Sequence, residues 1–308
     1  MPFTMANWMN YIPKTIKLSE ICMPGSHDAG MIAGQEYFPG NKYACQDLTI
    51  YQQCYQGVRF FDLRIGKNNN NAAAYHGFPP FREYGVRCST FLNDVAQFLT
   101  EQPSEFVVVR IDHTKAGTEE MLNLVQHHQA HIKLPANGGF DIGRYRRRDV
   151  MGHMILLCKE GDHFTEHRPA ARPFCHEYRK GNVIDVNGQL TTILGDYSDE
   201  NRRMQILNKQ IPQWDAFRLL KGDNPSLLYC LYLTNTGQIL SRLNMNIRQL
   251  TESQDHGMKP WIIQGNNLQG RFRVAMVIPN IIFHDFCDEQ TCERIVALNR
   301  WVLRLNNI

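Results

Sequence analysis

The strongest constraint on the fold is a regular alternation along the chain between short apolar runs and longer segments of helical character. The apolar runs are rich in β-branched and aromatic residues, as expected of buried strands. Seven such runs occur, at residues 16–22, 57–65, 105–113, 153–160, 226–234, 259–265 and 280–286. Helices are predicted between or after them, at 46–56, 91–102, 118–131, 201–220 and 288–305. Strands that alternate with helices in this way predict a parallel sheet.

The same alternation predicts the domain organisation. No Ser/Pro-rich linker interrupts it, and α/β barrels of about 250 residues commonly form one domain. We therefore expect an α/β fold with one domain over residues 1–308, a TIM-type (β/α) barrel, and keep a distorted or incompletely closed barrel as the alternative. The segment KNNNNAAA at 67–74 is predicted to be a flexible loop.

Composition narrows the class of protein. The chain has 308 residues, of which 43% are hydrophobic and 20% charged, a balance typical of a globular protein with a large core. No run reaches the roughly 18 apolar residues that a membrane-spanning helix needs. The N-terminal residues lack the pattern of a secretory signal. We therefore expect a cytoplasmic protein, or one exported without such a signal.

Charge and cysteine content suggest neither a nucleic-acid partner nor a disulfide framework. The net charge of +3 is too small to indicate nucleic acid by itself. Four arginines lie within residues 144–148; we favour a solvated loop there, with contact to an anionic membrane surface as the alternative. The nine cysteines form no CxxC pair, so we expect reduced thiols. We also expect a monomer.

Charged residues recur where the predicted strands end. Because side chains alternate along a strand, Phe60, Asp62 and Arg64 would share the face that points into a barrel. By the same rule Arg110 and Asp112 share a face, whereas His113 would point to the opposite one. Parallel α/β barrels collect their chemistry at the carboxyl ends of the strands. A structural ion pair between Asp62 and Arg64 is the alternative interpretation.

Two histidines and three other charged residues fall at these strand ends. The segment CMPGSHDAG at 22–30 follows the first predicted strand, and FHDF at 283–286 closes the last. First and last strands are neighbours in a closed barrel, so a cluster of His27, Asp28, Arg64, His76 and Asp285 is geometrically reasonable. Two histidines, each oriented by a carboxylate, with a guanidinium between them could move protons at a phosphodiester.

The motifs that carry these residues resemble those of the phosphatidylinositol-specific phospholipase C family, in particular its X-type catalytic barrel. MPGSHDAG, QGVRFFDLRIG, YHGF and FLNDVAQFLTEQPSEFVVVRID occur in the order and spacing of the family's histidine loop, second strand, second-histidine loop and the helix before the third strand. DVMGHMILL and PNIIFHDF also resemble family segments. The resemblance is strong up to about residue 114 and weaker between about 160 and 225.

The resemblance implies a role for each residue of the cluster. His27 would be the general base that acts on the inositol 2-hydroxyl, supported by Asp285. His76 would be the general acid for the departing diacylglycerol oxygen, supported by Asp28, and Arg64 would hold the phosphate. The implied products are diacylglycerol and inositol 1,2-cyclic phosphate. On this assignment the adjacent residues His27 and Asp28 do not serve each other.

Position 64 also bears on the need for a metal. By resemblance, calcium-dependent members carry acidic ligands here and an asparagine after the first histidine, whereas metal-independent bacterial members carry arginine and aspartate. The chain has Arg64 and Asp28. A guanidinium supplies the positive charge that calcium would supply, and both together would repel. We therefore expect no cofactor, and keep Asp28, Asp62 and Asp112 as the alternative of a partial calcium shell.

The resemblance also indicates substrate-binding residues. Lys159 matches a position where the family places a cation near the inositol ring, and Asp196 with Tyr197 falls where a ring-binding aspartate is expected. We count Asp62 and Asp112 among the residues of this site as well. Asp112 stands where bacterial members tend to have lysine, a departure that weakens the prediction for the headgroup more than that for the phosphodiester chemistry.

An enzyme acting on an inositol phospholipid has to contact the membrane surface that holds it, and we expect that contact to be transient. Aromatic residues could form the rim that touches the lipid. The candidates for this rim are Trp8, Tyr11, Phe38, Tyr43 and Phe81.

Two other functions stay open. The first is a metal-dependent glycerophosphodiester or sphingomyelinase D type phosphodiesterase, which shares the barrel and two histidines but needs an acidic metal cluster. The second is a non-catalytic module that binds lipid headgroups. Arg64 counts against the first, and the complete set of histidines and carboxylates counts against the second.

Overall fold

Eight parallel strands form a closed barrel in the computed structural model, which confirms the predicted TIM-type fold and excludes the incompletely closed alternative. The structure describes residues 2–34, 43–77, 82–135, 141–181, 190–222, 224–235, 246–264, 267–272 and 277–302. The barrel strands are β1 (Met23–Ser26), β2 (Phe60–Leu63), β6 (Val107–Ile111), β7 (Met154–Lys159), β8 (Cys175–Lys180), β9 (Thr191–Leu194), β10 (Leu227–Leu233) and β11 (Ile281–His284).

The barrel closes between the first and the last strand. Around it the strands follow the order β1-β11-β10-β9-β8-β7-β6-β2. Ser26 of β1 lies opposite His284 of β11, and Gly25 lies opposite Phe60 of β2. The segments that follow β1, β2 and β11 therefore meet at one end of the barrel.

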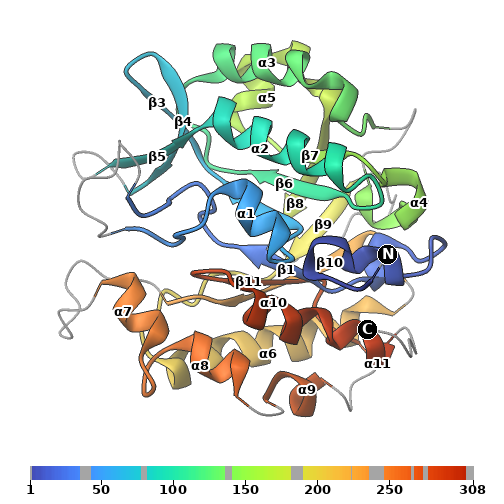
Figure 1. The fold of residues 1–308 in the computed structure, drawn as a ribbon, viewed down its shortest axis with the longest axis vertical. Coiled ribbons are helices and arrows are strands. Elements are labelled where there is room, and N and C mark those ends of the chain that lie inside the picture. The colour runs from blue at the N-terminus through green and yellow to red at the C-terminus, as the bar shows by residue number, and fades with distance from the viewer. Residues whose placement is uncertain are drawn as a thin grey trace.

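Helices flank the barrel on both sides (Figure 1). In this view α2, α3 and α5 lie above the strands, and α6, α7, α8 and α10 lie below them. The helices are α1 (Ile50–Tyr55), α2 (Cys88–Glu101), α3 (Thr118–His127), α4 (Arg147–Val150), α5 (His163–His167), α6 (Arg203–Lys221), α7 (Ile247–Glu252), α8 (Met258–Ile263), α9 (Asn267–Phe272), α10 (Glu289–Val296) and α11 (Leu298–Val302). Short 3-10 helices are η1 (Met5–Tyr11), η2 (Leu18–Glu20), η3 (Gln129–His131), η4 (Ile142–Arg144) and η5 (Pro169–Phe174).

A small antiparallel sheet stands beside the barrel where a loop was predicted. Its strands are β3 (Ile65–Asn68), β4 (Asn71–His76) and β5 (Glu83–Arg87), and it lies at the upper left of Figure 1. Asn69 and Asn70 connect β3 to β4 with φ of 45° and 73°, the left-handed conformation of a tight hairpin turn, which asparagine tolerates. The prediction of a flexible loop at 67–74 was therefore wrong, and the paired asparagines are the signal of the hairpin.

Two predicted strands are not strands. Residues 16–22 contain the 3-10 helix η2, and the first strand begins later, at Met23. It contains Pro24 and Gly25, residue types depleted in strands, but a Cβ on Gly25 would lie 2.8 Å from a methyl of Ile281, so only glycine fits against β11. Residues 259–265 were also predicted as a strand. Residues 259–264 lie in and just after α8, whose Pro260 occupies the first turn, where a helix needs no N–H donor, and Gly265 lies outside the described residues.

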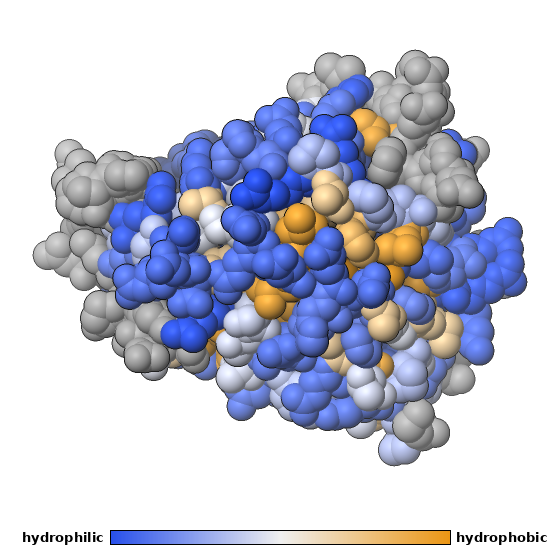
Figure 2. Space-filling model, turned by 90° about the horizontal axis from the view of Figure 1, so that it is seen from above, coloured by the Kyte–Doolittle hydropathy of each residue, from blue (hydrophilic) through white to orange (hydrophobic). Residues whose placement is uncertain are grey.

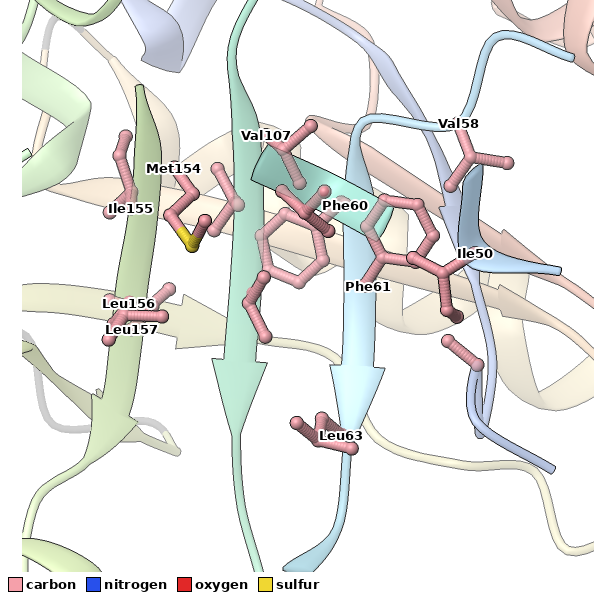
Figure 3. Close-up of a cluster of buried hydrophobic side chains, with 14 of the residues drawn as sticks. Ile50, Val58, Phe60, Phe61, Leu63, Val107, Met154, Ile155, Leu156 and Leu157 are labelled. Carbon is pink, nitrogen blue, oxygen red and sulfur yellow. The ribbon is translucent and has the colours of Figure 1, made fainter. Parts of the chain in front are cut away.

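The core follows the predicted alternation of β2. Phe60 points into the barrel and contacts the ring of Phe283 of β11, with ring centroids 5.5 Å apart. Phe61 points outward and meets Phe91 of α2 at 5.8 Å. Figure 3 shows these two side chains on β2 together with apolar side chains of the adjacent strands, including Val107 and Met154. The outward, apolar face of β2 thus packs against the helices. The inward face carries Asp62 near the carboxyl end of the strand.

A buried ion pair joins the amino-terminal end of the barrel to the first residues of the chain. The guanidinium of Arg59 donates to Oε2 of Glu105 from Nη2 at 2.7 Å and from Nε at 3.0 Å, and both side chains are fully buried. Nη2 also donates to the carbonyl of Ala6 at 2.7 Å. The indole of Trp8 donates to the carbonyl of Gly57, so this predicted rim aromatic is a buried residue near the start of β2.

We expect Arg59→Met to lower the free energy of unfolding by about 3–5 kcal/mol, because the carboxylate of Glu105 would stay buried without its partner. Denaturant unfolding followed by circular dichroism measures the change. Arg179→Met is the matched control: its pair with Glu160 is partly solvent-exposed and should contribute at most about 1 kcal/mol. Equal effects of the two variants would contradict this account of the pair.

Candidate active site

The first histidine is placed by a sharp turn directly after β1. His27 follows Ser26, and the backbone of Asp28 adopts φ of 41°, a left-handed conformation that is strained for most residues but tolerated by aspartate. Phe286, which follows Asp285 after β11, has φ of 51°. The chain therefore turns sharply after both β1 and β11. The side chains of His27 and Asp285, which follow these strands, meet at the mouth of the barrel.

His27 and Asp285 form a buried hydrogen-bonded pair. Nδ1 of His27 lies 2.8 Å from Oδ1 of Asp285, so the ring nitrogen donates to the carboxylate. The other carboxylate oxygen of Asp285 accepts from the backbone N–H of Asn235 at 3.0 Å. The carboxylate is thus held from both sides, and it fixes the ring so that Nε2 faces away from Asp285.

Asp28 connects the second histidine to the arginine. Nδ1 of His76 donates to Oδ2 of Asp28 at 2.6 Å, and Nε of Arg64 forms an ion pair with Oδ1 at 3.0 Å. The structure therefore contains both predicted histidine–aspartate contacts. It also shows Nε2 of His27 only 3.4 Å from Oδ2 of Asp28, so the expectation that His27 and Asp28 do not serve each other was incomplete.

The surrounding charges set the pKa values of His27 and Asp28. Burial lowers the pKa of His27, but the charges of Asp28 and Asp285 outweigh burial, and the pKa of the ring is raised above its usual value. Burial raises the pKa of Asp28, but Arg64 and the two histidines outweigh it, and the pKa of this carboxyl is held far below its usual value. The site thus keeps Asp28 charged and makes His27 a stronger base than an ordinary histidine.

A second ion pair lies next to Arg64 inside the barrel. Asp62 accepts from Arg110, with Nη2 at 2.9 Å, so its partner is Arg110 and not the Arg64 of the structural alternative. The hydroxyl of Tyr197 donates to Oδ2 of Asp62 at 2.8 Å and accepts from Arg64 at 3.4 Å. Nη1 of Arg110 donates to the hydroxyl of Tyr232 at 2.6 Å. This network contacts Arg64 at Nη2, whereas Asp28 contacts it at Nε.

The remaining predicted substrate-binding residues lie beside this centre, toward α6. Asp196 is exposed and pairs with Lys180 at 2.8 Å, so it does not share the contacts of its neighbour Tyr197. Asp196 and Lys180 line a cavity of about 800 Å³ together with Lys159. Lys159 comes within 3.9 Å of Asp112, whose other oxygen accepts from the hydroxyl of Tyr178.

Strand alternation predicted that His113 points away from Asp112, but the two side chains are in contact. β6 ends at Ile111, and His113 has φ of 58°, so the alternation rule no longer applies at this residue. Its Nδ1 lies 3.2 Å from Oδ1 of Asp112.

Two amide side chains that sequence analysis missed hold the backbone around the catalytic candidates. Gln46 is buried; its Nε2 donates to the carbonyls of His27 and His284, and its Oε1 accepts from the N–H of Cys287. Asn235 is fully buried, and its side chain bonds to three backbone groups, among them the N–H of Met258. Neither residue lies in a chemical motif, so only the three-dimensional structure reveals them.

The aromatic rim predicted for membrane contact is not supported as a set. Trp8 is buried at the amino-terminal end of β2, and Tyr11 packs against Phe3 near the start of the chain. Tyr43 lies in the site, where its ring stacks on His76 with centroids 5.1 Å apart. Phe38 and Phe81 lie outside the described residues.

The arginine-rich segment is not a solvated loop throughout. It spans η4 and α4, and the guanidinium of Arg147 is buried and donates to the carbonyl of Ile12. The nine cysteines, by contrast, are free and buried, as predicted for reduced thiols.

No helix among the described residues is both long and apolar enough to span a bilayer. Seen from above, over α3 and α5, the molecule is mainly hydrophilic, with hydrophobic residues grouped near the middle of the face (Figure 2).

Two groups of side chains in the site could approach a metal ion. His27, Asp28 and Asp62 form one, and His27, Cys45 and Asp285 form the other. In the first group, Arg64 and Arg110 already neutralise the two carboxylates. A divalent cation there would meet the positive charges of two guanidinium groups.

Comparison with known proteins gives clear relatives. The 1-phosphatidylinositol phosphodiesterase of Listeria monocytogenes is 33% identical over 305 residues, which cover 97% of this chain and 86% of the relative. No protein-family model matches the chain.

Solved structures agree in fold. The phosphatidylinositol-specific phospholipase C of Listeria monocytogenes superimposes with a TM-score of 0.66 and 20% identity over 96% of this chain and 98% of that one. A phosphatidylinositol-specific phospholipase C of Staphylococcus aureus gives 0.67 and 18% over 96% and 97%.

The contact between His27 and Asp285 predicts how the pKa of His27 responds to a change at Asp285. Because Asp285 is one of the two carboxylates that raise the pKa of His27, Asp285→Asn should lower that pKa, and the ring should become neutral at a lower pH. NMR titration of the His27 ring measures the pKa directly. Asp196→Asn, an exposed carboxylate outside this cluster, is the control. A His27 pKa that stays unchanged or rises in Asp285→Asn would refute the assignment.

Proposed function

Because the chain belongs to the phosphatidylinositol-specific phospholipase C family, we propose that it cleaves the phosphodiester of an inositol phospholipid into diacylglycerol and inositol 1,2-cyclic phosphate. The observation that carries this proposal is the arrangement of two histidines, each bonded through Nδ1 to its own aspartate, around one arginine. With Nδ1 engaged in both rings, Nε2 is the nitrogen that each ring would present to the substrate, although Nε2 of His27 also lies 3.4 Å from Asp28.

In the proposed reaction His27 acts first as a base. Its Nε2 takes the proton of the inositol 2-hydroxyl while the 2-oxygen attacks phosphorus and forms the new P–O bond. Asp285 stabilises the imidazolium that results, and Asp28, 3.4 Å from Nε2, contributes to the same effect. The raised pKa of His27 has the same origin: both carboxylates favour the protonated ring.

His76 and Arg64 serve the other half of the reaction. As the bond from phosphorus to the glycerol oxygen breaks, protonated His76 donates its Nε2 proton to that oxygen, and diacylglycerol leaves as a neutral alcohol. The guanidinium of Arg64 binds the phosphate oxygens and offsets the charge that develops on them. Asp28 orients both groups at once, since one oxygen contacts each of them.

We propose that this reaction needs no metal ion. Two guanidinium groups occupy the positions beside Asp28 and Asp62 at which a cation would otherwise balance the carboxylates. Arg64 can contact the phosphate directly and therefore supplies the electrostatic stabilisation that calcium would give.

The inositol ring would lie on the side of the cavity that Lys159, Lys180 and Asp196 line. Charged and amide groups that converge on one side of the reacting centre suit a ring with several hydroxyl groups. Tyr197 would contact the inositol ring as well, since its own ring lies next to that of His27, with centroids 5.3 Å apart. We further propose transient contact with the membrane surface by a monomeric enzyme that lacks a spanning helix in its described part.

The products decide between the candidate reactions. We expect phosphorus NMR to show inositol 1,2-cyclic phosphate from phosphatidylinositol vesicles, at the same rate in excess EDTA. Phosphatidylcholine and glycerophosphodiesters should stay uncleaved under the same conditions. Loss of activity in EDTA would favour the metal-dependent phosphodiesterase, and binding of the vesicles without any turnover would favour the headgroup-binding module.

Removing either histidine should abolish most of the activity. His27→Ala and His76→Ala should each lower kcat by about 10²–10⁴-fold, the usual contribution of a general base or acid. His127→Ala, an exposed histidine of α3, should keep the parent's rate. A steady-state assay on vesicles measures all three. If His27→Ala retained more than a tenth of the activity, another residue would have to be the base.

A further inference from the structure

We propose that His27, Cys45 and Asp285 form an inhibitory site for a thiophilic divalent cation, with Zn²⁺ as the representative ion. A ring nitrogen of His27, the Sγ of Cys45 and a carboxylate oxygen of Asp285 all lie within 4.8 Å of one another. The effect on hydrolysis rests on the proposed function, but binding of the ion does not.

Cys45 is held at this place by the backbone. Its N–H donates to the carbonyl of Met31 at 3.0 Å, and its carbonyl accepts from the N–H of Phe286 at 2.7 Å. The residue therefore bridges the segment after β1 and the end of β11, which carry the other two ligands. Its thiol is buried and has no role in the proposed reaction.

The three ligands match the preferences of zinc. Thiolate, imidazole and carboxylate are its common protein ligands, at about 2.3, 2.0–2.1 and 2.0–2.2 Å. Ligand atoms around a tetrahedral zinc are then about 3.3–3.7 Å apart, so only a small side-chain movement is needed to bring these three into range. Three protein ligands leave a fourth position for water, as in accessible zinc sites.

The group of His27, Cys45 and Asp285 differs from the group of His27, Asp28 and Asp62 in how its carboxylate is neutralised. In the described part of the chain, the ion-pair partner of Asp285 is His27 alone. Asp28 and Asp62, by contrast, are paired with Arg64 and Arg110. A cation between Cys45 and Asp285 would therefore meet one thiolate and one carboxylate, whose two negative charges balance the two positive charges of the ion.

Binding would stop the reaction through His27. The ion releases the thiol proton of Cys45 and forms bonds to sulfur, nitrogen and oxygen. If the ring binds through Nε2, its lone pair is no longer available to the substrate hydroxyl. If it binds through Nδ1, the remaining proton sits on Nε2, and the ring again cannot act as a base. A hard cation such as Mg²⁺ or Ca²⁺ prefers oxygen ligands and should not compete for this group.

The test combines activity with spectroscopy on untagged protein freed of metal. We expect Zn²⁺ to inhibit the parent reversibly, with recovery in EDTA, and Mg²⁺ or Ca²⁺ at the same concentration to have no effect. Relative to its own rate in EDTA, Cys45→Ser should need at least about tenfold more Zn²⁺ for half-inhibition, since loss of supporting contacts alone lowers metal affinity by 10–100-fold. Cys22→Ser, a buried thiol before β1 at the opposite end of that strand, should behave as the parent does.

Cobalt reports on binding without reference to turnover. Co²⁺ added to the parent should give the near-ultraviolet thiolate-to-cobalt absorption, which should persist in Cys22→Ser and vanish in Cys45→Ser. If Cys45→Ser does not fold, the cadmium-113 NMR shift of the parent still shows whether sulfur is a ligand. Equal inhibition of parent and Cys45→Ser by Zn²⁺, or cobalt and cadmium spectra without a sulfur ligand, would overturn the proposal. A parent without hydrolytic activity would refute the proposed function, while the spectra would still decide the metal site.

Discussion

The site depends on keeping the carboxylate of Asp28 charged inside the protein. An isolated buried carboxylate costs many kcal/mol and would take up a proton. Here Arg64 lies 3.0 Å from one oxygen, and His76 and His27 lie 2.6 and 3.4 Å from the other. These three partners hold the pKa of Asp28 far below its usual value. The same contacts orient the arginine and the second histidine, so one charge organises most of the proposed machinery.

Bringing these partners together requires particular features of the fold. The left-handed turn at Asp28 directs its side chain back toward the mouth, and closure of β1 against β11 places Asp285 beside His27. The β3–β4 hairpin returns His76 to the same place, 12 residues after Arg64. Gln46 and Asn235 then fix the backbone on either side, so that Nδ1 of His27 stays on Asp285.

The sequence predicted the residues of the site better than it predicted the local secondary structure. Strand alternation in β2 and the neighbourhood of first and last strands predicted that these charged residues could cluster, and the family resemblance implied the pairs of His27 with Asp285 and of His76 with Asp28. It failed where residues break the usual propensities: β1 contains Pro24 and Gly25, and Pro260 looked like part of a strand although it lies in the first turn of α8. Contacts between amide side chains and distant backbone, such as those of Gln46, have no sequence pattern and could not be predicted. The role of Asp196 likewise could not be inferred, because its side chain and that of Tyr197 point to different neighbours.

The central claim is that the two histidines and Arg64 surround the scissile phosphate, and a crystal structure with a non-hydrolysable phosphonate analogue of the inositol phospholipid headgroup tests it most directly. The account predicts the phosphonate oxygens on Arg64 and His76, with the inositol 2-hydroxyl within about 3 Å of Nε2 of His27. A phosphonate bound instead between Lys159 and Lys180, with no group of the ligand within hydrogen-bonding distance of His27, would contradict it.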